Sequence, residues 1–146
     1  MKSFINKTIT VETTVNIPIT DLWNYWTLPE HIIQWYHASD DWHAPFAEND
    51  LCVDGKFRTT MAARDGSFQF NFEGVYTRVD PRQRIEFLIA DGRKVNISFT
   101  SLGNRTHITE SFEAEETHTL EQQRDGWQAI LDNFRKYAEA AWKTSE

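Results

Sequence analysis

The chain has 146 residues, a formal net charge of −7 and one cysteine, Cys52. This length predicts a single domain over residues 1–146, and an acidic balance without a basic block argues against nucleic acid as a partner. No apolar run approaches the ~18 residues of a membrane span, and the first residues lack the apolar core of a signal peptide. A lone cysteine allows no internal disulfide and favours a reducing, cytoplasmic setting.

The first part of the chain predicts one strand followed by two short helices. Residues Lys7 to Val15 alternate β-branched apolar and polar side chains, as a half-buried strand does. Pro18 ends this strand, and apolar residues recur at helical spacing from Ile19 to Trp26. Leu28-Pro29 breaks the first helix, and Glu30 to Trp35 predicts a second. Both are too short to be stable alone, so we expect them to pack against a larger element.

The middle of the chain, from Trp42 to Phe112, predicts an antiparallel meander. Apolar and polar residues alternate there in about six short runs separated by turn signals. The strongest of these signals is Asp65-Gly66. Gly74 interrupts the following run and suggests a bulge or sharp bend, and such a feature can change which side chains face inward. The facing of the side chains after Gly74 is therefore left open.

The last stretch, Thr119 to Trp142, predicts one helix about 35 Å long at ~1.5 Å per residue. Thr119 and Gln122 have the spacing of a capping box, so the helix is expected to start there or at Thr117. Gly126 costs ~1 kcal/mol in a helix interior, so we expect close packing on a neighbouring strand or loop to compensate for it. Trp127 beside it should enter the core, and we expect Trp127→Ala to cost ~3–5 kcal/mol of stability.

The predicted order is a strand, two short helices, a long meander and one long helix. Strands followed by a helix indicate an α+β fold in which the helix lies across the sheet. A curved antiparallel sheet wrapped around a long C-terminal helix leaves a gap wherever side chains do not fill it. Such a gap is the usual place for a small-molecule site.

Several short motifs match a known family, in the right order and along nearly the whole chain. They are Ile17-Pro18 with Leu22-Trp23, the run from Leu28 to Trp35, Asp50 to Phe57, Phe72 to Tyr76 continuing through Asp80-Pro81 to Ile85, Thr106 with Ile108-Thr109, and Glu121 to Arg124 with Gly126-Trp127, Leu131 and Phe134. On these motifs the chain resembles the activator-of-Hsp90-ATPase-homologue group of the START-like (SRPBCC) superfamily. The resemblance implies the helix-grip fold and a single START-like domain, but this superfamily hosts binders, carriers, cyclases and co-chaperone domains. One departure is Asp54-Gly55, where the family usually has paired glycines.

The side chains expected to face the gap are mostly rings and apolar groups, with a few polar groups among them. The residues predicted to line the cavity are Trp35, Phe46, Phe57, Thr59, Met61, Phe72, Tyr76, Phe87, Glu110, Gln123, Trp127, Leu131 and Phe134. A carboxylate on a dry face needs a partner, a raised pKa or water. Glu110 therefore has two interpretations: a functional group inside the cavity or, as the favoured one, a solvated strand end.

No motif identifies a catalytic or metal site. The five histidines lack the H-x-x-x-H and H-E-x-x-H spacings that place two ligands on one helix face, so we predict no metal and no cofactor. No G-x-S-x-G nucleophile elbow is present. Cys52 is predicted to be a buried small residue, and His107 to point outward.

Three functional hypotheses follow. The leading one is the binding of a small apolar or amphipathic molecule between the sheet and the long helix. The second, implied by the resemblance, is a module that docks on an Hsp90-type chaperone and raises its ATPase rate. The third is an enzyme of the cyclase or hydrolase kind with Glu110 or His107 as a general base. An exposed edge strand or the tryptophan-rich helical segment would also allow a homodimer.

Overall fold

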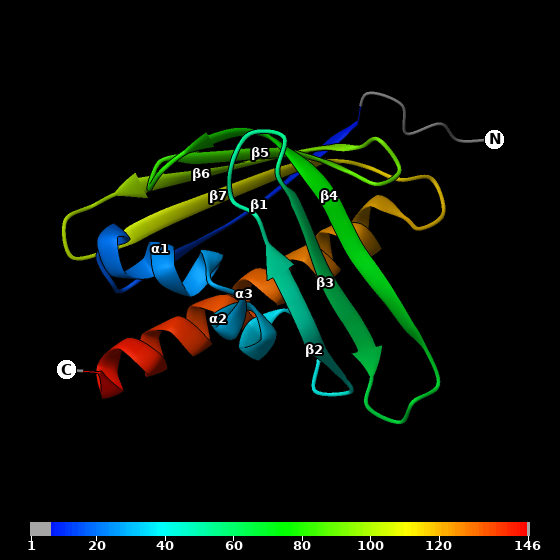
Figure 1. Cartoon of the computed structure of the whole chain (residues 1–146), viewed down its shortest axis with the longest axis horizontal. Coiled ribbons are helices and arrows are strands. Elements are labelled where there is room, and N and C mark those ends of the chain that lie inside the picture. Colours follow the sequence, from blue (N-terminus) through cyan, green and yellow to red (C-terminus); the bar gives the residue numbers. More distant parts are fainter. Residues whose placement is uncertain (1–6, 146) are drawn as a thin grey trace.

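Seven strands and three helices make up the computed structural model, which describes residues 7–145 (Figure 1). In chain order the elements are β1 (Thr8–Val15), α1 (Ile19–Thr27), α2 (Pro29–Trp35), β2 (Trp42–Asn49), β3 (Lys56–Ala63), β4 (Gln69–Asp80), β5 (Arg84–Ile89), β6 (Lys94–Ser101), β7 (Thr106–Glu113) and α3 (Leu120–Thr144). The predicted order of one strand, two short helices, a meander and a long helix is confirmed.

The strands form one antiparallel sheet in the order β1-β7-β6-β5-β4-β3-β2. Strands β2 to β7 follow one another as a meander, and β1 joins the far edge by pairing with β7, from Thr8 opposite Glu113 to Val15 opposite Thr106. The sheet curls so that β4, β3 and β2 turn down beside α3, while the other strands pass over it (Figure 1). This curled sheet around one long helix is the α+β helix-grip architecture expected from the sequence.

Helix α3 begins where its capping chemistry predicts. The hydroxyl of Thr119 accepts a hydrogen bond from the backbone N–H of Gln122 at 3.0 Å, and the Gln122 side chain accepts one from the backbone N–H of Thr119 at 2.9 Å. These bonds satisfy donors that a helix N-terminus otherwise leaves unpaired. The buried residues Leu131, Phe134 and Ala138 lie further along the helix and attach it to the sheet and to α1 and α2.

One half of the space under the sheet is filled by aromatic side chains. Phe134 of α3 is fully buried, and its ring lies 4.8 Å from those of both Trp26 and Trp35. Trp26 in turn makes an edge contact with Phe99 of β6 at 5.5 Å. Edge-to-face ring pairs of this kind add to the stabilisation that burial alone provides. The short helices α1 and α2 are therefore held by this cluster, as their length requires.

Gly74 is needed for close packing of strands rather than for a bulge. It pairs regularly with Phe57 and Ile89, and the register shift in β4 lies further on, between Tyr76 and Arg78. A Cβ atom at position 74 would lie 2.3 Å from the Leu88 carbonyl oxygen and 3.0 Å from the Phe57 ring. The prediction of a bulge at Gly74 is thus wrong, and Tyr76 keeps the inward parity of the preceding residues.

Gly126 has open space around it, contrary to the close packing expected. A Cβ atom there would meet nothing within 4 Å, because the residue borders a cavity. We therefore expect Gly126→Ala to stabilise the protein by about 0.5–1 kcal/mol through helix propensity. Gly74→Ala should instead destabilise it by about 1–3 kcal/mol, since the backbone oxygen of Leu88 cannot move aside cheaply. Urea unfolding of both variants measures the contrast, and a loss of stability in Gly126→Ala would contradict it.

The turn between β2 and β3 keeps its shape without a glycine pair. Asp54 adopts a positive φ of 71°, and a Cβ atom at Gly55 would lie 2.0 Å from the carbonyl oxygen of Asp50. The second position therefore requires glycine, whereas the first accepts aspartate. Cys52 in this turn is exposed, so the prediction that it is buried is wrong. Its Sγ donates a hydrogen bond to Asp50, which raises the pKa of Cys52 and keeps it a thiol.

Candidate functional site

A cavity of about 410 Å³ lies under the sheet next to the first half of α3. Its lining comes from α1, α2, the β3–β4 hairpin, β7, α3 and the loops before β6 and α3, and it is mostly apolar. The predicted site residues that border it are Trp35, Met61, Phe72, Glu110, Gln123, Trp127 and Leu131. Its volume falls within the roughly 300–1,000 Å³ of small-molecule pockets.

A smaller cavity of about 50 Å³ adjoins the first. Trp35, Phe72 and Glu110 border both, so these side chains separate the two spaces. The remaining predicted site residues on its border are Phe57, Thr59, Tyr76 and Phe87. The structure thus brings together most of the residues that alternation and helical spacing selected.

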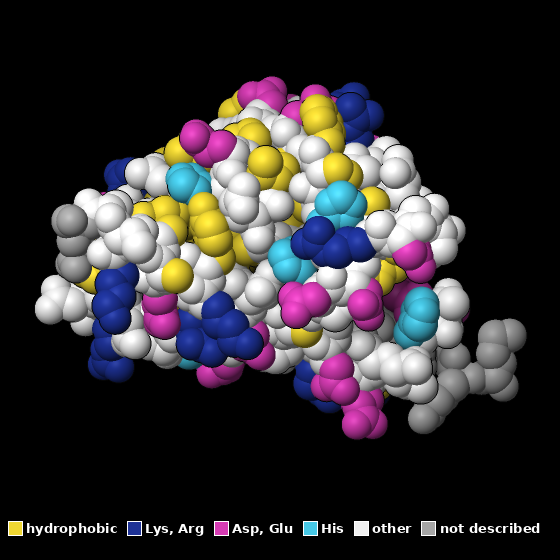
Figure 2. Space-filling model, turned by 90° about the horizontal axis from the view of Figure 1, so that it is seen from below, with side chains coloured by type: hydrophobic (Ala, Val, Ile, Leu, Met, Phe, Trp, Pro, Cys, Tyr) yellow, Lys and Arg dark blue, Asp and Glu magenta, His cyan; other side chains and the backbone are white. Residues whose placement is uncertain are grey.

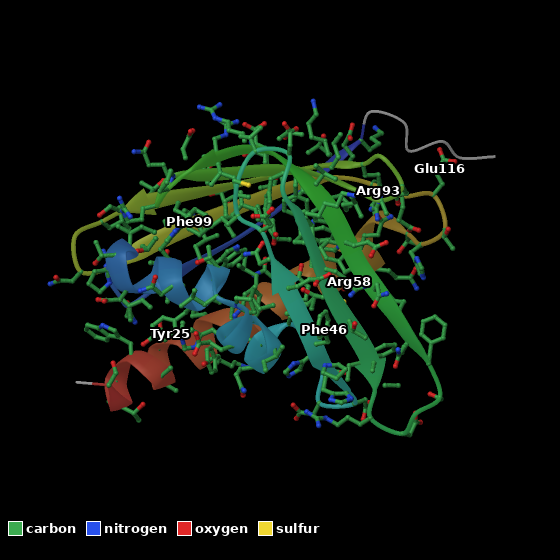
Figure 3. All side chains as sticks on the ribbon, viewed as in Figure 1. Tyr25, Phe46, Arg58, Arg93, Phe99 and Glu116 are labelled. Atoms are coloured by element: carbon green, nitrogen blue, oxygen red, sulfur yellow. The ribbon has the colours of Figure 1, made fainter. Side chains whose placement is uncertain are left out.

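Two predicted cavity residues lie elsewhere. The register of β2 shifts between His43 and Phe46, where Pro45 stands in an edge strand. Because such an irregularity reverses which side chains face inward, Phe46 is exposed, with the Arg58 guanidinium 5.2 Å from its ring centroid (Figure 3). Phe134 is a core residue, enclosed by Trp26 and Trp35 without facing the cavity. Both assignments to the cavity lining are therefore wrong.

The cavity remains open because the rings around it pack against one another. Trp127 stacks on Phe112 with the ring centroids 3.8 Å apart and the planes 11° from parallel. The Phe72 and Trp127 rings meet edge to face with their centroids 6.0 Å apart, and the Phe72 and Tyr36 rings stack with their centroids 5.8 Å apart. Gly126 adds no side chain at this level of the helix. Stacked rings flanked by a glycine leave a space that none of these side chains can fill without losing its contacts.

Glu110 is the polar side chain buried most deeply in this lining. Thr106, Ile108, Glu110 and Phe112 alternate inward along β7, and Glu110 lies between Val11 of the edge strand β1 and Ile97 of β6. It is 6% exposed and makes no hydrogen bond to another described residue. Burial raises the pKa of Glu110 to about 8, so the carboxyl group is mostly protonated at neutral pH. The favoured interpretation as a solvated strand end is wrong.

Tyr36 is a cavity residue that the sequence did not reveal. It follows α2 as its C-cap, borders both cavities, and its hydroxyl makes no hydrogen bond to another described residue. Burial and then the negative charge of Glu110 raise the pKa of Tyr36, so the hydroxyl keeps its proton. Helical spacing pointed to Trp35 instead, and both side chains face inward only because the helix ends between them.

Two other polar side chains near the cavity, those of Tyr76 and Gln123, already have partners. The Tyr76 hydroxyl donates a hydrogen bond to Asn49 Oδ1 at 2.5 Å. The Gln123 amide donates to the carbonyl oxygens of Glu115 and His118, both at 3.0 Å, and its oxygen accepts from the Glu115 backbone N–H at 2.9 Å. Gln123 therefore ties the preceding loop to α3. Its side chain borders the cavity without offering a free donor.

His107 lies outside this cavity. His107 is on the opposite face of the sheet, where Nδ1 is 2.8 Å from the Thr14 hydroxyl and Nε2 is 3.3 Å from Glu12. It points outward, as predicted, and cannot act as a base in the cavity. No cluster of three or more side chains suited to a metal ion occurs within residues 7–145. Within the same range, no helix has both the length and the apolar character needed to cross a bilayer.

Comparison with known proteins gives one family. A family profile described as "Activator of Hsp90 ATPase homolog 1-like protein" matches residues 16–139. The chain is similar to the solution structure of the AHSA1-like protein from Aeromonas hydrophila, with 44% identity over 92% of this chain and 93% of that one and a TM-score of 0.87. It is similar to a protein from Cytophaga hutchinsonii with 51% identity, coverage of 93% and 94%, and a TM-score of 0.79. No match was found among curated proteins.

A more distant structure shares the fold alone. The protein NE0264 from Nitrosomonas europaea is 17% identical, with coverage of 93% and 96% and a TM-score of 0.78. At that identity the likeness concerns the arrangement of helices and strands and carries no information about a ligand.

Proposed function

Because the chain belongs to the family of activator of Hsp90 ATPase homolog 1-like proteins, we propose that it binds a small apolar or amphipathic molecule between its sheet and α3. The observation that carries this proposal is the cavity of about 410 Å³. Apolar and aromatic groups with a few polar ones among them are the usual lining of a small-molecule site. An apolar guest would gain free energy from leaving water, at about 25 cal/mol per Å² of apolar surface buried.

Gly126 offers a direct way to block the cavity. It borders the cavity, and its missing Cβ has nothing within 4 Å, so a leucine there can extend into the space. We expect Gly126→Leu to lower the affinity for ethylnaphthalene about tenfold or more, because the guest and the new side chain compete for one volume. Isothermal titration calorimetry of the wild type and the variant measures this.

Lys136→Leu is the matched control for that experiment. Lys136 is exposed on the same helix and does not border the cavity, so its replacement adds the same apolar side chain elsewhere. The control should bind ethylnaphthalene as the wild type does. Equal binding by Gly126→Leu and the wild type would show that the guest occupies another place. If Gly126→Leu does lower the affinity, a mass spectrum of the organic extract of the purified wild-type protein would identify the natural guest.

An enzyme that uses Glu110 is a second candidate function, because this carboxyl group lies in the cavity. A group with a pKa of about 8 is suited to take and return a proton near neutral pH. If this candidate is right, a guest recovered from the wild-type protein changes chemically when it is incubated with that protein. The same guest stays unchanged when it is incubated with Glu110→Gln. An unchanged guest after incubation with either protein would rule out the enzyme and leave binding as the only function supported.

A chaperone partner is supported only by the family name. The face in Figure 2 intersperses acidic, basic and apolar side chains, with no field of one sign that would select a charged partner. The Hsp90-type partner, a homodimer and a cytoplasmic location stay predictions. A chaperone ATPase assay with and without this protein decides the first of them, and an unchanged rate would remove it.

A further inference from the structure

We propose that the guest of this cavity is a neutral molecule with a carbonyl-type oxygen, and that this oxygen accepts hydrogen bonds from the Glu110 carboxyl group and the Tyr36 hydroxyl. The inference rests on the proposed binding function and names the chemical class of the guest. It would place the apolar body of the guest against the Trp127 and Phe72 rings. Its polar end would point to the border between the two cavities.

The position of Glu110 is the first argument. Its nearest neighbours across the sheet are Val11 and Ile97, so no neighbouring strand supplies a polar partner. The side chain is 6% exposed and borders both cavities, yet it makes no hydrogen bond within residues 7–145. Because the carboxyl group borders the cavity, a guest bound there can supply the hydrogen-bond partner that the neighbouring strands do not.

Tyr36 gives the second argument, because it reaches the same place from α2. Its ring is fixed between Trp35, at 5.0 Å, and Phe72, at 5.8 Å. Its hydroxyl has no hydrogen-bond partner among the described residues, and it also borders both cavities. Glu110 and Tyr36 both border each of the two cavities, which places them beside the same space. Two unpaired groups from different elements thus converge on one space.

The protonation of these groups selects the guest. Burial holds the pKa of Glu110 near 8 and that of Tyr36 well above its usual value, so both groups carry a proton at neutral pH. A carbonyl oxygen has two lone pairs and can accept from both donors. A cationic guest would require Glu110 to ionise and an ion pair to be buried among rings, where desolvation opposes the attraction.

Among the described residues, no titratable group on the surrounding elements supplies a charge that would favour a cationic guest over a neutral one. Those near Glu110 or on the cavity border are Tyr36 after α2, Glu48 on β2, Tyr76 on β4, Arg93 before β6, and Glu115 and His118 before α3. Glu48 pairs with Arg58 at 3.2 Å. Arg93 is engaged by Asp91 at 2.9 Å and by the Glu113 carbonyl oxygen at 3.2 Å. Glu115 and His118 are bonded to each other at 3.1 Å. None of these charged groups pairs with the Glu110 carboxyl.

Three naphthalene probes of nearly equal shape test the proposal. They are acetonaphthone with a carbonyl group, ethylnaphthalene without a polar group, and naphthylethylamine with a cationic amine. At neutral pH we expect calorimetry to give acetonaphthone about tenfold tighter binding than ethylnaphthalene, the gain of roughly one net hydrogen bond. This preference should weaken in Glu110→Leu and in Tyr36→Phe, vanish in the double variant, and persist in Glu110→Gln, which keeps an N–H donor.

Raising the pH separates the carboxyl group from its amide substitute. In the wild type the carbonyl preference should fall as the pH passes about 8, since the ionised carboxylate cannot donate. In Glu110→Gln it should stay constant. Glu73→Leu is the control, because Glu73 is an exposed carboxylate on β4 that does not border the cavity, and it should behave as the wild type.

The outcomes distinguish this inference from the binding function itself. Equal wild-type affinities for acetonaphthone and ethylnaphthalene, tightest binding of naphthylethylamine, or a carbonyl preference that is unchanged in Glu110→Leu would each overturn the inference. In each of these cases the cavity would still bind apolar guests. Failure of all three probes to bind would overturn both proposals.

Discussion

Glu110→Gln is expected to gain stability relative to the wild type as the pH rises, by about 3–5 kcal/mol between about pH 4 and pH 9. The cause is the rise in the Glu110 pKa from its ordinary value of 4.5 to about 8 when folding buries the group. Between pH 4.5 and about pH 8, Glu110 in the folded wild type keeps a proton that it has released in the unfolded chain. Its free energy of unfolding therefore falls as the pH rises through this window.

Glutamine does not titrate, so the variant does not lose stability in this way as the pH rises. Urea unfolding at a series of pH values measures the difference between the two proteins, and contributions from the other groups cancel in it. Glu73→Gln should run parallel to the wild type, because Glu73 is exposed. A constant difference between Glu110→Gln and the wild type over the whole range would show that Glu110 ionises as it does in water.

Phe134→Ala is expected to cost about 3–5 kcal/mol of stability, more than the truncation of the larger Trp127. Phe134 is fully enclosed, with Trp26 and Trp35 rings at 4.8 Å, so its removal creates a new void in packed core. Trp127 is only partly buried and borders a cavity already present. Its replacement by alanine should mainly enlarge that cavity, at a cost of about 1–3 kcal/mol from the lost contact with Phe112.

The order of these two variants is the informative result. Urea midpoints and slopes for both, compared with the wild type, give the free energies of unfolding. A larger loss in Trp127→Ala than in Phe134→Ala would place the tryptophan in the packed core, as the sequence alone suggested. The cavity would then be smaller than described.

The fold was predictable because its signals are local. The capping pair Thr119 and Gln122 marks the start of α3, and both hydrogen bonds are present. Alternation along β7 depends only on neighbouring residues, so it correctly placed Ile108, Glu110 and Phe112 on one face. Short turns between the strands then left a meander as the simplest topology.

The predictions were wrong where the pairing with another strand decides whether a side chain faces the core or the solvent. Phe46 alternates with Trp42 and Ala44 in sequence, but a register shift in β2 turns it outward. The prediction for Glu110 failed differently, since its face was right. Whether an inward carboxylate reaches water depends on the pairing of β1, β7 and β6, which no single segment encodes. The Tyr36 hydroxyl was missed because it follows the last helical residue of α2.

The most direct test of the account is an NMR measurement of contacts between bound acetonaphthone and the protein. Nuclear Overhauser effects from the naphthalene ring to the Trp127, Phe72 and Tyr36 side chains are the predicted result, since these rings border the cavity beside Glu110. Contacts confined to exposed rings such as Phe46 and Phe68, with none to Trp127, would contradict a guest enclosed between the sheet and α3.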